Sequence, residues 1–115
     1  MSPANIFHPL ASDLSESDLS ESDLTEEVFE TLAQSAGVKI ERIVSSGQAS
    51  PESGWYDQDH DEWVIVLQGA ATILFDNGTE VELGKGDYLN IPAHEKHRVT
   101  STSAEPKTIW LAVHY

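Results

Sequence analysis

The chain has 115 residues, of which 20 are acidic and 6 are basic, so its formal net charge is −14 at pH 7. Such a chain is repelled by phosphate backbones and by anionic lipid surfaces, so we expect neither nucleic-acid nor membrane partners. It contains no cysteine, which excludes disulfides, thiolate metal sites and cysteine nucleophiles. It also has no run of about 18 apolar residues that could cross a membrane as a helix, and we expect a cytoplasmic protein.

Residues 1–25 form an acidic, repetitive segment. A five-residue unit occurs three times between Ser12 and Glu26, as SDLSE, SDLSE and SDLTE. A period of five matches neither the helical period of 3.6 nor the strand period of 2, so the leucines cannot line one face. The pattern predicts an acidic low-complexity arm over residues 1–25 and one folded domain over residues 26–115. The arm either docks on a partner or is repeated sequence without one.

From Val38 onward, the sequence consists of short runs rich in β-branched and aromatic residues, separated by Gly, Pro, Asn and Asp. These runs predict strands at 38–45, 62–68, 70–75, 80–83, 88–91, 97–101 and 107–114. The sequence Asp76-Asn77-Gly78 predicts a hairpin turn between two of them. Residues 27–33 fit either the start of a helix or a strand, and we favour a strand. So many short strands predict an all-β sandwich or barrel.

The predicted strand at 62–68 is apolar on both faces. Trp63, Ile65 and Leu67 lie on one side, and Val64 and Val66 lie on the other. Such a strand is covered on both sides, for example by a second subunit, so we expect a homodimer.

Two segments carry the candidate site. The chain reads GWYDQDHDEWVIVLQG from Gly54 to Gly69, and GDYLNIPAHEKHRVT from Gly86 onward. With Glu62 seven residues before Gly69, and with Gly86, Pro92 and His97 at matching intervals, the segments resemble the two sequence motifs of the cupin family, in the same order. The resemblance covers residues 38–115 and implies a jelly-roll barrel with a polar site inside it. In the second motif, His94 replaces a glycine and Ser101 replaces an asparagine.

The resemblance also implies a metal. In cupins that bind one, two histidines and a glutamate of the first motif and a histidine of the second are the ligands. Here Tyr56 and Gln58 stand at the two histidine positions, and only Glu62 and His97 match. We therefore expect Glu62 and His97 as ligands, with His60 and Gln58 as further candidates, for one divalent ion of iron, manganese, nickel or zinc, or else no metal.

For several other residues, the sequence allows more than one position or role. Strand alternation would place His60 on the same face as Glu62, whereas the motif spacing places it at the rim. Glu62 could instead form an ion pair with Arg98 or Arg42. His94 is expected in a turn near the mouth, and the sequence does not decide where His114 faces. Four aromatic residues could line a pocket, and we expect the last two of them in the core: Trp55, Tyr56, Trp63 and Trp110.

Two functions follow from these expectations. The first is a metal-dependent oxygenase, isomerase or lyase that acts on a small organic molecule. The second is a metal-free cupin module that binds a small ligand between Tyr56, Gln58, Glu62 and His97 without catalysis. A third hypothesis is a dimeric interaction protein whose acidic arm recognises a partner. The sequence assigns no catalytic residue.

Overall fold

The computed structural model describes residues 2–7, 27–50 and 54–115, and in these residues all regular secondary structure is β-strand. Within these ranges, no helix is long and apolar enough to cross a membrane. The strands are β1 (Val28–Ser35), β2 (Val38–Ser45), β3 (Glu62–Gln68), β4 (Ala71–Phe75), β5 (Glu80–Leu83), β6 (Tyr88–Ile91), β7 (His97–Thr102) and β8 (Thr108–His114). The strands predicted from the sequence after residue 38 are all present, with ends shifted by about one residue at most.

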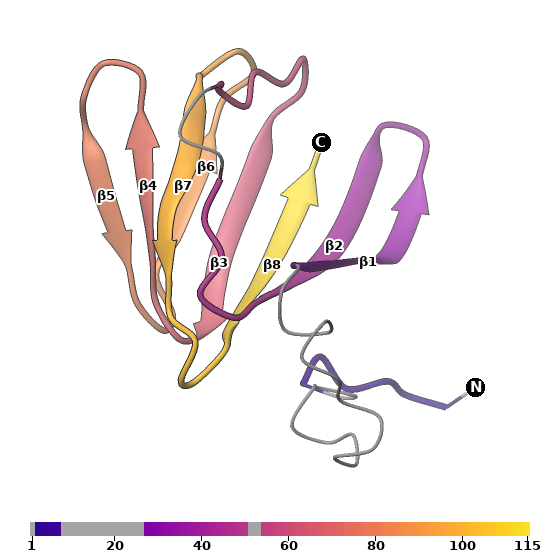
Figure 1. The fold of residues 1–115 in the computed structure, drawn as a ribbon. Coiled ribbons are helices and arrows are strands. Elements are labelled where there is room, and N and C mark those ends of the chain that lie inside the picture. The colour runs from indigo at the N-terminus through magenta and orange to yellow at the C-terminus, as the bar shows by residue number, and fades with distance from the viewer. Residues whose placement is uncertain (1, 8–26, 51–53) are drawn as a thin grey trace.

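The strands form two antiparallel sheets (Figure 1), one in the order β1-β2-β8-β3-β6 and the other in the order β5-β4-β7. Alternate residues of each sheet point toward the other sheet and build one core between them. Ile43, Val66 and Trp110 come from the larger sheet, and Ile73 and Leu83 come from the smaller one. The fold is therefore the all-β jelly roll that the sequence predicts.

Strand β3 shows which of its two apolar faces is inside. Val64 and Val66 are buried, and Glu62 is buried with them. Trp63 lies on the opposite face, only half-buried, with its ring 5.5 Å from that of Tyr88. The prediction that Trp63 belongs to the core is therefore wrong.

Strand β1 confirms the strand expected over residues 27–33, since it pairs with β2 along its whole length and all eight of its residues are exposed. Most of the predicted acidic arm over residues 1–25 lies outside the described residues. Nearby, the carbonyl of Ile6 accepts a hydrogen bond of 3.0 Å from Arg42.

Two connections between strands depend on particular residues. The predicted hairpin joins β4 to β5, where Asn77 Oδ1 accepts from the backbone N–H of Thr79 at 2.9 Å. Gly69 has a φ of +85°, and a Cβ atom there would lie 2.8 Å from the Cα atom of Thr108. No larger residue fits this close approach between the end of β3 and the start of β8.

Candidate functional site

A cavity of about 150 Å³ lies between the two sheets. Its walls are mainly apolar and include Val64, Ile73, Val99 and Trp110. Its polar lining comes from several strands and from the segment before β3, and consists of Glu27, Glu41, Tyr56, Gln58, Glu62, His97 and His114. The site is thus an apolar pocket with a cluster of polar side chains, as is usual for small-molecule sites.

Glu62 opens β3, and its side chain points inward because it shares the inner face of the strand with Val64. Its carboxylate accepts a hydrogen bond of 2.9 Å from Gln58 Nε2 through Oε1. The same oxygen lies 3.7 Å from His97 Nε2, which is ion-pair distance but too long for a hydrogen bond. On its other side, Oε2 lies 3.9 Å from His114 Nε2.

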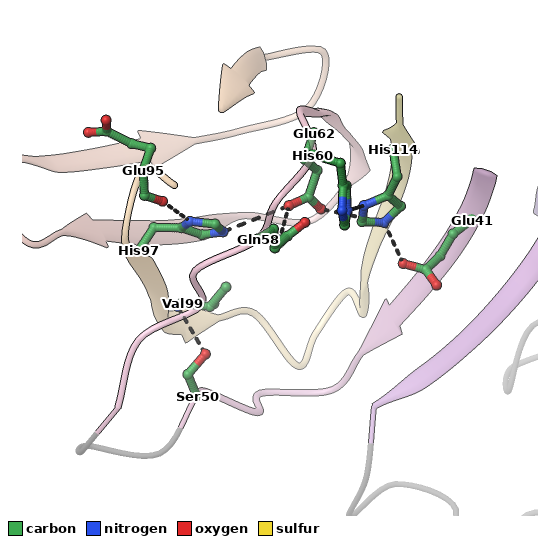
Figure 2. Close-up of polar contacts among 9 residues, drawn as sticks. All are labelled: Glu41, Ser50, Gln58, His60, Glu62, Glu95, His97, Val99 and His114. Atoms are coloured by element: carbon green, nitrogen blue, oxygen red, sulfur yellow. Dashed lines mark hydrogen bonds and ion pairs between the residues drawn. The ribbon is translucent and has the colours of Figure 1, made fainter. Parts of the chain in front are cut away.

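His97 opens β7 and is 5% exposed. Its Nδ1 contacts the carbonyl oxygen of Glu95 at 2.8 Å. A carbonyl only accepts, so Nδ1 carries the proton and donates. This contact turns Nε2 toward Glu62, as Figure 2 shows.

The segment before β3 is held against β7. The backbone groups of Tyr56 and His97 exchange two hydrogen bonds of 2.8 and 3.2 Å. The phenol ring of Tyr56 lies 5.6 Å from the imidazole ring. Farther along, Ser50 is also joined to β7, because its side-chain Oγ accepts a hydrogen bond from the N–H of Val99 at 3.0 Å (Figure 2).

The contact between Glu62 and His97 shifts both of their pKa values. Burial alone would raise the pKa of the carboxyl and lower that of the imidazole. For Glu62, burial is outweighed by His97 and Gln58, and the pKa falls below its ordinary value of 4.5. For His97, burial is outweighed by Glu62 and the Glu95 carbonyl, and the pKa rises above its ordinary value of 6.5. Between pH 4.5 and pH 6.5, Glu62 is therefore a carboxylate that faces the imidazolium of His97.

A second histidine cluster adjoins this pair. His114 ends β8, and its Nε2 lies 3.1 Å from Glu41 Oε1 on β2 (Figure 2). Its Nδ1 lies 2.9 Å from His60 Nε2. Glu41 also pairs with Lys39 at 3.3 Å. His60, with a side chain 41% exposed, therefore lies at the rim and contacts His114.

The remaining candidates are not among the residues that line the cavity. Arg98 lies over the ring of Trp55, 4.7 Å from its centroid. His94 is exposed, has a φ of 65° and contacts Asp57, as a turn residue would. Arg42 pairs with Glu30.

Glu62, for which an ion pair with an arginine is the alternative from the sequence, contacts His97 and His114. Two signals would have pointed to the second histidine cluster. Glu41 shares a face of β2 with buried Ile43, and His114 shares a face of β8 with buried Trp110.

The side chains present do not fit the metal site that the sequence resemblance implies. In the described ranges, no three histidine or carboxylate side chains converge as a metal site would require. Glu62 and His97 face each other, His114 Nε2 lies 3.9 Å from Glu62 but closer to Glu41, and the carboxylate oxygen nearer to His97 already accepts from the Gln58 amide. Comparable catalytic sites use three protein ligands. His60, the remaining imidazole candidate, is directed to His114 instead.

A family model described as a cupin domain matches residues 42–114. The chain belongs to the cupin family. This confirms the resemblance drawn from the two motifs. A comparison with curated proteins finds no match.

Several solved structures are similar to this chain. A "putative mannose-6-phosphate isomerase" from Ralstonia eutropha JMP134 is 38% identical, with 99% of this chain and 97% of that chain covered and a TM-score of 0.83. A cupin superfamily protein from Desulfitobacterium hafniense DCB-2 is 25% identical, with 92% and 86% covered and a TM-score of 0.69. The iron(II) form of HppE is 16% identical, with 77% and 50% covered and a TM-score of 0.65, and this likeness shows the fold alone.

Proposed function

We propose that this cupin binds a small organic molecule in the pocket between its sheets and needs no bound metal to do so. One observation carries the proposal. Tyr56 and Gln58 stand at the two histidine positions of the first motif, so Glu62 and His97 share the pocket with a phenol and an amide. The cavity, about 150 Å³, is as large as one that takes up benzene. The ligand is therefore a molecule of roughly six to ten non-hydrogen atoms.

The charges of the lining argue against a phosphorylated sugar. The described lining residues include Glu27, Glu41 and Glu62 but neither lysine nor arginine. Phosphate recognition relies on arginine, lysine or clustered backbone N–H groups. The activity in the name of the Ralstonia protein is therefore not carried over to this chain.

A second candidate function is proton-transfer catalysis of the isomerase or lyase type. The pKa values of Glu62 and His97 are shifted in opposite directions, which yields a carboxylate base and an imidazolium acid in one pocket. His97 would give a proton from Nε2, and Glu62 would accept one at a carboxylate oxygen. The oxygenase alternative needs a metal, for which the described residues provide no group of three histidine or carboxylate side chains.

The binding proposal is tested by NMR titration of chelator-treated, isotope-labelled protein with a library of small fragments. We expect a binding fragment to shift the signals of Tyr56, Val64 and Trp110, with Val113 on the outer face as the unaffected control. Binding that appears only after iron, manganese, nickel or zinc is added would contradict the metal-free proposal and restore the metal-dependent one.

We also propose that the protein is a homodimer. The support is the outer face of β3 and β6, where the rings of Trp63 and Tyr88 lie 5.5 Å apart and Tyr88 is exposed. Light scattering tests this proposal, and a mass near the monomer value of 12.6 kDa would reject it.

A further inference from the structure

A row of polar side chains runs from solvent to the wall of the pocket. His60 Nδ1 lies 3.2 Å from Asp59 Oδ1, and His60 Nε2 lies 2.9 Å from His114 Nδ1. His114 Nε2 in turn lies 3.1 Å from Glu41 Oε1 (Figure 2) and 3.9 Å from Glu62 Oε2. The exposed fraction of the side chains falls along this row, from 90% at Asp59 to 41% at His60 and 17% at His114. The row therefore connects the surface to the carboxylates of the pocket.

The carboxylates at the two ends of the row fix two of the ring protons. A carboxylate only accepts hydrogen bonds, so His60 Nδ1 donates to Asp59, and His114 Nε2 donates to Glu41. The hydrogen bond from His60 lowers the pKa of Asp59, so this carboxyl group is ionised near neutral pH. Glu41 is also paired with Lys39, at 3.3 Å.

The contact between the two imidazole rings fixes a third proton. Two facing N–H groups would repel each other, and so would two facing lone pairs, so the contact of 2.9 Å between His60 Nε2 and His114 Nδ1 contains one proton. Two neutral imidazole rings carry only two N–H protons between them. In this arrangement the two rings therefore hold three protons and one positive charge.

The charged groups around the two rings match a single positive charge. Asp59 contacts His60 from the segment before β3, while Glu41 on β2 and Glu62 on β3 face His114. Of these three negative charges, Lys39 pairs with Glu41, and the imidazolium of His97 faces Glu62. One negative charge is left, and one positive charge shared by the two rings balances it.

We infer that His60 and His114 share one positive charge and form a proton relay between Glu62 and solvent. This inference rests on the proton-transfer function proposed above, in which Glu62 accepts a proton and has to release it again. A ligand in the pocket displaces the water around Glu62, so a route through side chains is required while the pocket is occupied.

The relay moves one proton at a time. His114 gives the proton on Nε2 to Glu62 Oε2, so that an N–H bond breaks, an O–H bond forms and two neutral rings remain. His60, at the exposed end, then takes up a proton from solvent and restores the third ring proton. Release of a proton from Glu62 follows the same steps in reverse.

NMR of the isotope-labelled, untagged and chelator-treated full chain at pH 7 counts the ring protons of each histidine. We expect one proton on His60 Nδ1, one on His114 Nε2 and a third between the facing nitrogens, seen as a scalar coupling across the hydrogen bond. Asp59→Ala removes the acceptor that fixes the proton on His60 Nδ1, so we expect it to reduce the count to two. A count of two in the wild type, or of three in Asp59→Ala, would overturn the inference.

His60→Gln separates a relay from a structural contact. A glutamine amide can donate to His114 Nδ1 but cannot pass a proton on. We expect the proton on His114 Nε2 to exchange with water about tenfold more slowly than in the wild type, measured by saturation transfer, because a positioned acid–base group is lost. His94→Gln, at the turn histidine that contacts Asp57, is the matched control and leaves the exchange unchanged. Unchanged or faster exchange in His60→Gln, as the loss of a side chain that only covers His114 would give, would overturn the inference.

Neither measurement uses a substrate, so failure of the relay and failure of the proposed function are distinguishable. If the NMR results contradict the relay, Glu62 and His97 still stand as the acid–base pair. If the relay is confirmed but no bound compound undergoes proton transfer on the protein, the proposed proton-transfer function is wrong and the charged histidine pair remains.

Discussion

Glu62→Gln should weaken the fold in a way that depends on pH. The substitution keeps the shape of the side chain but removes the charge that faces His97. Both side chains are nearly buried, with exposed fractions of 11% and 6%, so solvent screens their attraction little. At 3.7 Å, opposite unit charges attract by about 4.5 kcal/mol at an effective dielectric constant of about 20, before the cost of burying them.

The net loss of stability is smaller than this attraction, and it depends on the protonation states of Glu62 and His97. Because folding lowers the pKa of Glu62, its carboxylate stabilises the fold above pH 4.5. This contribution is lost as the pH falls through the folded-state pKa. Because folding raises the pKa of His97, its imidazolium stabilises the fold below pH 6.5. This contribution is lost as the pH rises through the folded-state pKa. After the substitution, His97 can release its proton, which limits the cost. We expect a loss of about 2 kcal/mol at pH 6 and of about 1 kcal/mol or less at pH 9.

Urea unfolding of the wild type and of Glu62→Gln at pH 6 and pH 9 measures this difference. Glu82→Gln on the exposed side of β5 is the matched control, with an expected change below about 0.5 kcal/mol at both pH values. An equal loss at both pH values would refute the reasoning, because it would show that Glu62 stabilises the fold by its hydrogen bonding and not by its charge.

Two further predictions concern the fold. Gly69→Ala should cost about 3 kcal/mol or more, since its Cβ would lie 2.8 Å from the backbone of β8, whereas Gly78→Ala, at a similar φ of +90° with open space around it, should cost about 1 kcal/mol. Urea unfolding checks both, and equal losses would contradict the close approach. Val66→Ala in the core, where the side chain is 0% exposed, should cost about 2 kcal/mol, against less than about 1 kcal/mol for Val113→Ala on the outer face. Similar losses at both positions would show that the assignment of the two faces is wrong.

Strands and turns were predictable because their signals are local. Alternation of apolar residues and the turn sequence Asp76-Asn77-Gly78 depend only on neighbours in the chain. Alternation could not tell which face of β3 is inside, since both faces are apolar. The larger side chain, Trp63, faces outward, and the parity of Glu62 in the motif was the better guide.

The site was predictable only in part. The motif spacing identified Glu62 and His97, which the structure brings within 3.7 Å. Glu41 and His114 are separated by 73 residues and meet because β2 pairs with β8. Strand parity indicates that each of the two side chains faces inward, but which strands pair depends on the whole sheet and leaves no local signal. The orientation of His60 toward His114 has the same origin.

The central claim is that the pocket works without a metal, and elemental mass spectrometry of the untagged protein tests it most directly. The wild type, Glu62→Gln and His97→Ala are each incubated with iron, manganese, nickel and zinc and then freed of unbound ions. We expect well below one equivalent of any metal in the wild type and no difference among the three proteins. About one equivalent in the wild type, lost in both variants, would contradict it.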